Sequence, residues 1–196
     1  MEQTEDRPAG ARRRGAELEE TILAAAWEEL AEVGYARLTM EGVAARAQTG
    51  KQVLYRRWRN RAALVIAAVR HRTGSIVDHI PDTGDLRADV LDVLGWMARR
   101  RRDFGADTVH GLMVELPDLD PSVFVDMRGV MGTVLARAAA RGEIPTADLP
   151  ARVVTLPVDL LRHQMLLTQE PIEDTTLTEI TDEVFLPLVR AITKQT

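Results

Sequence analysis

A short break in a helical apolar pattern constrains the fold of this 196-residue chain more than any other feature. Apolar residues recur at helical spacing over residues 39–47 and again over residues 50–58, which predicts two short helices. The polar residues 48–50 (QTG) interrupt the pattern, and the glycine is free to turn the chain. Thr39 has a side chain able to cap the first helix. The stretch therefore predicts a helix-turn-helix.

The second of these helices has two chemically different faces. Its apolar residues, Val53, Leu54 and Trp58, are predicted to turn toward a core. Charged, amide and phenol side chains occupy the other side and the ends: Lys51, Gln52, Tyr55, Arg56 and Arg59. These residue types are the ones that meet DNA, because lysine and arginine read guanine edges and glutamine reads adenine.

Charge is concentrated around this motif. Residues 37–72 hold nine basic residues and one acidic residue, net +8, in a chain of net charge −5, so the remaining residues carry −13. A positive module on an acidic chain indicates a polyanion bound at one place, because phosphate neutralisation supplies most nucleic-acid affinity.

Two further helices are predicted to flank the motif. Residues 17–33 form one apolar stripe that predicts a supporting helix ending at Gly34. Asn60 is a candidate cap for a fourth helix running toward His79. Residues 1–16 are polar and predict a flexible arm, either a solvated tail or a minor-groove contact.

Residues 17–64, which contain these motifs, resemble the DNA-binding domain of the TetR family of transcriptional regulators. The resemblance rests on Gly34, on residues 38–40 (LTM), on Val43 and Ala44, on residues 50–58 (GKQVLYRRW), and on Arg61 and Leu64. It implies a sequence-specific DNA-binding regulator, a repressor that a small-molecule effector releases from a palindromic operator.

Two positions depart from the family pattern. Gln48 stands where the family usually has a glycine, so a positive φ is expected there at some steric cost. Arg61 stands where lysine is usual and keeps the charge.

The resemblance also implies roles for eight residues of the motif. Base-edge contacts are expected from Lys51, Gln52 and Arg56. Phosphate contacts are expected from Thr39, Thr49, Gly50, Tyr55 and Arg61.

Beyond Gly84 the chain predicts helices throughout, which makes the predicted fold all-α. The predicted helices cover residues 85–102, 108–115, 122–141, 151–170 and 176–193. We therefore expect a helix-turn-helix DNA-binding domain over 17–62 and a helical bundle for ligand binding and dimerisation over 63–196. The second part resembles the corresponding domain of the family more weakly.

The last two predicted helices carry more apolar surface than a small domain easily hides, although Pro157 and Pro187 lie within them and predict kinks. One interpretation is a homodimer with a two-fold four-helix interface, which a palindromic operator requires. The other is an ordinary intramolecular core.

A cluster of methionine and aromatic residues is the candidate pocket for a small apolar effector, an expectation drawn from the family; plain core is the alternative. The candidate residues are Trp96, Met97, Phe104, Met113, Phe124, Met127, Met131 and His163. Four successive arginines, Arg99 to Arg102, suggest an anionic ligand, but they point in all directions around a helix and a solvated face is the simpler interpretation.

Other classes of protein find little support. The chain has no cysteine, and its four histidines lack zinc-site spacing, so we expect no disulfide, metal or cofactor. No phosphate loop or nucleophile motif predicts an enzyme. With no apolar run of membrane-spanning length, we expect a cytoplasmic protein. The remaining alternative is a helical ligand-binding or partner-binding protein with a vestigial DNA-binding module.

Overall fold

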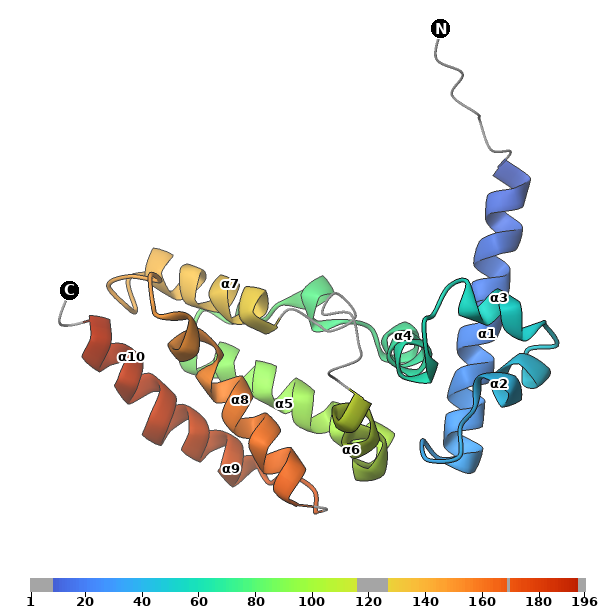
Figure 1. Cartoon of the computed structure of the whole chain (residues 1–196). Helices are drawn as coiled ribbons and strands as arrows, with labels where there is room; N and C mark the ends of the chain where they lie inside the picture. Colours follow the sequence, from blue (N-terminus) through green and yellow to red (C-terminus); the bar gives the residue numbers. More distant parts are fainter. Residues whose placement is uncertain (1–8, 116–126, 169, 194–196) are drawn as a thin grey trace, which may run out of the picture. The chain divides into compact units, whose positions relative to one another are not determined.

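The computed structural model describes residues 9–115, 127–168 and 170–193 (Figure 1). Across these residues it contains helices and connecting turns but no strand, which confirms the all-α prediction for the described part. The chain divides into two compact units. The first holds the described residues up to Gly74 together with Val114 and Glu115, and the second holds Ser75–Met113 and the described residues from Met127 onward.

Four helices build the first unit: α1 (Ala9–Val33), α2 (Met40–Arg46), α3 (Lys51–Tyr55) and α4 (Arg61–Thr73). Helix α1 packs against α4 and α2, and α2 packs against α3. Because α1 begins at Ala9, residues 9–16 extend a helix where the sequence predicted a flexible arm. Three alanines and three arginines in this segment are strong helix formers that outweigh its two glycines.

Both predicted helix caps are present. The Gly42 N–H donates to Thr39 Oγ1 at 3.0 Å, and the Ala63 N–H donates to Asn60 Oδ1 at 2.9 Å. Helix α4 stops at Thr73 instead of continuing to His79. Gly74 takes a φ of 74° that ends it, so the boundary between the units falls one helix later than the predicted boundary at residue 62.

The turn between α2 and α3 contains a non-glycine residue with a left-handed backbone. Gln48 has a φ of 50°, which confirms the expectation drawn from its position in the motif. A left-handed conformation costs an L-residue about 1–2 kcal/mol, so the surrounding contacts must hold this turn in place. Helix α3 is shorter than predicted, but Leu54 and Trp58 are buried as expected and Val53 is half-buried.

The second unit is a helical bundle around α5. Its helices are α5 (Leu86–Phe104), α6 (Ala106–Glu115, whose last two residues cluster with the first unit), α7 (Met127–Ala140), α8 (Ala151–Leu167), α9 (Asp174–Thr178) and α10 (Leu186–Thr193). A π-helical segment, Glu179–Phe185, connects α9 to α10. Helix α5 packs against α7, α8, α9 and the π-helical segment, and the apolar core lies between these elements. The predicted helices match within three residues at their ends, except that residues 122–126 lie outside the described part. The predicted helix 176–193 is divided into α9, the π-helical segment and α10.

The two internal prolines have different local settings. Pro157 lies inside α8, which continues through it. Pro187 is the second residue of α10, and the turn before it is π-helical instead of α-helical. Because proline lacks an N–H and its ring crowds the carbonyl four residues earlier, a widened turn upstream relieves that conflict.

Candidate nucleic-acid interface

The exposed side of α3 carries the side chains predicted to read DNA. Lys51, Gln52, Tyr55 and Arg56 are all exposed, and Tyr55 retains 49% of its accessible surface. Gln52, Tyr55 and Arg56 lie one, four and five residues after Lys51, a spacing that keeps all four side chains on one side of the helix. The fully buried Leu54 lies on the opposite side. The structure therefore brings these four predicted residues together on a single surface.

Several cations near this surface are bonded within the unit and hold it together. Arg46 on α2 pairs with three glutamates of α1: Glu29 at 2.9 Å, Glu28 at 3.8 Å, and Glu32. Arg57, after α3, donates to the Gly15 carbonyl at 3.3 Å and pairs with Glu19 at 3.7 Å. These contacts fix α2 and the end of α3 to the long first helix.

Other cations are available for an external partner. Arg56 and Arg59 make no hydrogen bond or ion pair with any residue that the structure describes. Lys51 has one loose ion pair, 3.6 Å from Glu41, and both side chains are more than half exposed. An exposed pair of this kind contributes about 1 kcal/mol at most, so a phosphate or a base edge can replace it. Arg59 was predicted to lie among the side chains of the types that meet DNA, but the sequence assigned it no specific contact.

The remaining predicted contacts lie around the turn. The Thr39 oxygen accepts the α2 cap bond, which leaves its hydroxyl hydrogen free to donate. The Thr49 N–H donates to the Ala44 carbonyl at 3.0 Å, so the side chain is the group of Thr49 left for a phosphate. Gly50 occupies the N-cap position of α3 with an ordinary φ of −79°.

Arg61 differs from its prediction as a phosphate contact. Its guanidinium donates to the Glu115 carboxylate at 2.7 Å and 3.0 Å and to the Leu38 carbonyl at 3.2 Å. It also lies 4.9 Å from the centre of the Tyr35 ring. These partners belong to the same compact unit and occupy much of the guanidinium, so Arg61 is placed to hold the start of α4.

The protonation states of Tyr35 and Arg61 in this cluster do not change near neutral pH. Burial raises the pKa of the Tyr35 phenol well above its usual value, and the Glu115 carboxylate raises it further. The hydrogen bonds that Arg61 donates to the Glu115 carboxylate raise the pKa of the Arg61 guanidinium. Tyr35 therefore stays neutral and Arg61 stays charged near neutral pH.

The methionine and aromatic candidates for an effector pocket lie in the second unit. Met127 and Met131 are buried in its core, and Trp96 and Met97 pack against that core half-buried. Arg100 stacks on the rings of Trp96 and Phe104, with centroid distances of 4.3 Å and 5.7 Å. His163 is exposed, while Phe124 and the side chain of Met113 lie outside the described part. The core and ring contacts of these residues are compatible with packing as well as with a ligand site.

Within the described residues, no group of three or more histidine, cysteine, aspartate or glutamate side chains is arranged to hold a metal ion. No helix in the described ranges has the length and apolar character needed to cross a membrane.

The fold of the described residues is all-α, and its helix-turn-helix exposes lysine, glutamine, tyrosine and arginine from one short helix. These two features are typical of helix-turn-helix DNA-binding proteins. Residues 22–68 match the family described as "Bacterial regulatory proteins, tetR family". Residues 80–184 match the "Tetracyclin repressor-like, C-terminal domain".

Individual relatives agree with this match. The chain is 34% identical over 176 residues to the HTH-type transcriptional regulator Rv1556 of Mycobacterium tuberculosis, covering 86% of each chain. It is 29% identical over 185 residues to the DNA-binding transcriptional repressor TetR of Mycobacteroides abscessus, covering 90% of this chain and 96% of that one. The crystal structure of the TetR family transcription regulator SCO0332 superposes with a TM-score of 0.65 at 25% identity, over 86% of this chain and 97% of that one.

The chain belongs to the TetR family. It is accordingly a DNA-binding transcriptional regulator and not an enzyme, and a partner-binding protein with a vestigial DNA module is not favoured.

Replacing Arg61 with lysine, the usual residue of the family, tests its role within the first unit. In Arg61→Lys a single ammonium group replaces the planar guanidinium, whose separate N–H groups donate to Glu115 and to the Leu38 carbonyl at the same time. We expect the free energy of unfolding to fall by about 1–2 kcal/mol. Urea denaturation at fixed protein concentration measures this change.

Arg70→Lys is the matched control, because Arg70 is exposed on the same helix and has no partner among the described residues. Equal stability of the two variants would contradict the positioning role of Arg61.

Proposed function

We propose that this regulator is a repressor that binds a palindromic operator as a homodimer and is released by a small-molecule effector. The observation that carries the proposal is the exposed face of α3, where Lys51, Gln52, Tyr55 and Arg56 lie together and Arg59 follows without an internal partner. The name of the Mycobacteroides abscessus relative, a transcriptional repressor, supports the sign of regulation. We assign DNA reading to the first unit and dimerisation with effector binding to the second, acting in the cytoplasm.

The proposed contacts divide by what they read. Lys51, Gln52 and Arg56 contact base edges in the major groove, because their donors and acceptors match guanine and adenine. Phosphate contacts come from side chains around the turn and after α3: Thr39, Thr49, Tyr55 and Arg59, with the backbone of Gly50. Arg61 supports this arrangement from inside the unit.

A second apolar stripe on the C-terminal helices supports the homodimer. Helix α8 buries Val154, Val158 and Leu161 in its own core. It also carries four apolar residues at helical spacing: Val153, Leu156 and Leu160 are half-buried and pack partly against that core, and Leu167 is exposed. A parallel set follows in the π-helical segment and α10: Val184, Leu188 and Ile192. TetR-family regulators typically dimerise, and these two stripes are the surface we assign to that contact.

Symmetry then links the dimer to the operator. Two recognition helices related by a two-fold axis enter successive major grooves about 34–36 Å apart, so each half-site repeats in inverted order. An effector that favours a dimer with a different spacing releases the operator, and by reciprocity the operator weakens effector binding.

Alanine variants test the two kinds of contact separately. We expect Arg56→Ala to weaken binding to DNA from upstream of the chain's own gene by roughly tenfold or more and to reduce its preference over random DNA. We expect Arg59→Ala to weaken binding to all sequences alike and to reduce the log–log salt slope by about 1. Fluorescence anisotropy across a salt series measures both effects.

Arg152→Ala, an exposed arginine of α8 in the second unit, is the control and should leave the curves unchanged. If all three variants behaved alike, the contact assignment would be wrong. A salt slope near zero for the unmodified chain would instead favour a vestigial DNA module.

A charge placed on the second apolar stripe tests the dimer. Val184 is 42% exposed, and we expect Val184→Lys to shift the chain toward monomer, because a buried lysine in an apolar interface is strongly unfavourable. Sedimentation velocity measures the distribution of species. Val77→Lys, at a valine that is 52% exposed in the short 3-10 helix Ile76–His79, should remain dimeric; a dimeric Val184→Lys would contradict the assigned interface.

A further inference from the structure

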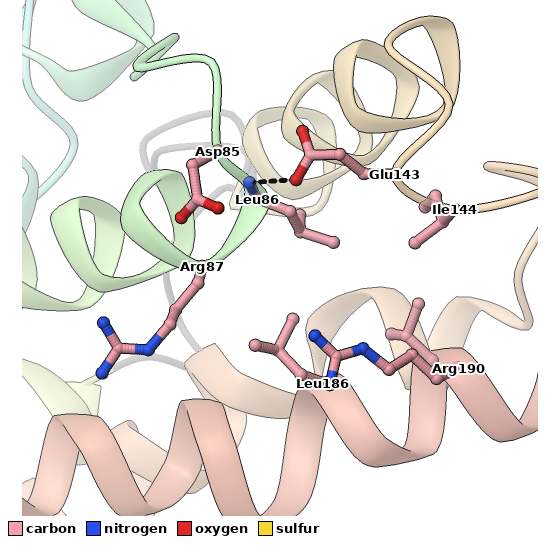
Figure 2. A pocket seen from close by; sticks show the side chains of 8 residues that line it. Asp85, Leu86, Arg87, Glu143, Ile144, Leu186 and Arg190 are labelled. Atoms are coloured by element: carbon pink, nitrogen blue, oxygen red, sulfur yellow. Dashed lines mark hydrogen bonds between the residues drawn. The ribbon is translucent and has the colours of Figure 1, made fainter.

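Two cavities of the second unit differ in how their charges are compensated. The smaller, of about 50 Å³, lies where the start of α5 meets Glu143 and α10 (Figure 2). Glu143 accepts the Leu86 N–H at 2.7 Å, and Arg87 pairs with Asp182 at 2.7 Å. Glu143 and Arg87 therefore already have partners. Arg190, which also lines the space, is exposed to solvent; the hydrogen bonds from Arg87 lower the pKa of Asp182, and the charge of Arg190 lowers it further. Since the space suits only one or two waters, this cavity gives no reason to expect a ligand.

The larger cavity, of about 180 Å³, lies at the other end of α5. Its lining comes from α5, the start of α6 and the segment before α9, and includes Ala98, Arg101, Arg102, Ala106, Pro171 and Ile172. A protein cavity of about 150 Å³ can hold a benzene molecule, so this space suits a small ring or a short chain. The lining combines apolar walls with two arginines, which indicates a ligand that is partly apolar and partly charged.

Arg101 is a buried cation with no counter-charge among the residues that the structure describes. Its side chain is 5% exposed and donates to the carbonyls of Glu170, at 2.5 Å, and Thr168. No described carboxylate forms an ion pair with it, and its Nε is buried without an acceptor. The two carbonyls, near the C-terminal end of α8, offset part of the charge. A buried cation remains costly until an anion approaches, so an arriving carboxylate gains more here than at a solvated arginine.

Two neighbouring groups add to this preference for an anion. Arg102, on the same lining, is exposed and has no partner among the described residues. Gly105, with a φ of 79°, turns the chain so that α6 begins at Ala106 beside the cavity. The first N–H groups of a helix have no acceptor within it and carry partial positive charge. Asp107, the acid of that turn, does not line the cavity.

We infer that this cavity binds the carboxylate of a small organic acid, with Arg101 and Arg102 facing the charge and Ala98, Pro171 and Ile172 contacting a short apolar body. The inference rests on the proposed effector response for its regulatory meaning, since it names the chemical class of that effector. Binding itself is a separate property that can be measured without DNA.

Isothermal titration of the full chain with benzoate, benzamide and inorganic phosphate tests the inference. We expect saturable binding of benzoate, and binding of benzamide weaker by roughly tenfold because it lacks the charge. Arg102→Ala should weaken benzoate binding by a similar factor. Arg99→Ala is the matched control, because Arg99 is exposed in the same run of arginines and does not line the cavity, and it should bind benzoate as the unmodified chain does.

Three results would overturn the inference: no saturable binding of benzoate, equal binding of benzamide, or equal losses in Arg102→Ala and Arg99→Ala. Phosphate binding as strong as that of benzoate would also overturn it, since the apolar wall would then contribute nothing. A parallel anisotropy titration separates the two proposals. Benzoate that binds while the chain fails to bind any DNA selectively would contradict the proposed function and leave this site standing.

Discussion

The recognition surface depends on how α3 is held, because five residues are too few to form a stable helix alone. Leu54 and Trp58 anchor it in the core of the first unit. Arg46 and Arg57 then bind α2 and the end of α3 to α1 through Glu29, Glu32 and Glu19. An isolated exposed ion pair contributes little to stability. A guanidinium that bonds to more than one carboxylate of the same helix contributes more, and it also restrains the position of its own helix relative to that helix. The exposed face of α3 owes its fixed direction to these buried and bonded neighbours.

The basic residues of the first unit therefore serve two purposes that a count of charges does not separate. Arg46, Arg57 and Arg61 are engaged inside the unit, so their charges position structure. Arg56 and Arg59 have no hydrogen-bond or ion-pair partner among the described residues. A phosphate can therefore bind them without displacing an internal partner. A charge already engaged internally releases fewer counterions on binding, so the salt dependence should follow the available cations and not the net +8 of residues 37–72.

Local sequence signals predicted much of this arrangement. The caps at Thr39 and Asn60, the positive φ of Gln48 and the burial of Leu54 and Trp58 each follow from chemistry within a few residues, and each is observed. The internal role of Arg61 was not predictable, because its partner Glu115 lies 54 residues away. The same limit applies to Arg101, whose acceptors are 67 and 69 residues distant and which appeared in the sequence as one of four equivalent arginines. The helical start at Ala9 was not predicted, because the two glycines and the polar residues of this segment favour coil, whereas its alanines and arginines favour helix.

The central claim is that the exposed face of α3 reads base sequence in two symmetric half-sites. Selection of bound duplexes from a random library, with the unmodified chain and with Gln52→Glu, tests it most directly. If α3 reads the bases, both proteins enrich an inverted repeat. The repeat selected by Gln52→Glu differs at one base pair in each half-site, because glutamine accepts from and donates to adenine whereas glutamate accepts from cytosine. Enrichment of no sequence, or of the same motif by both proteins, would contradict the central claim.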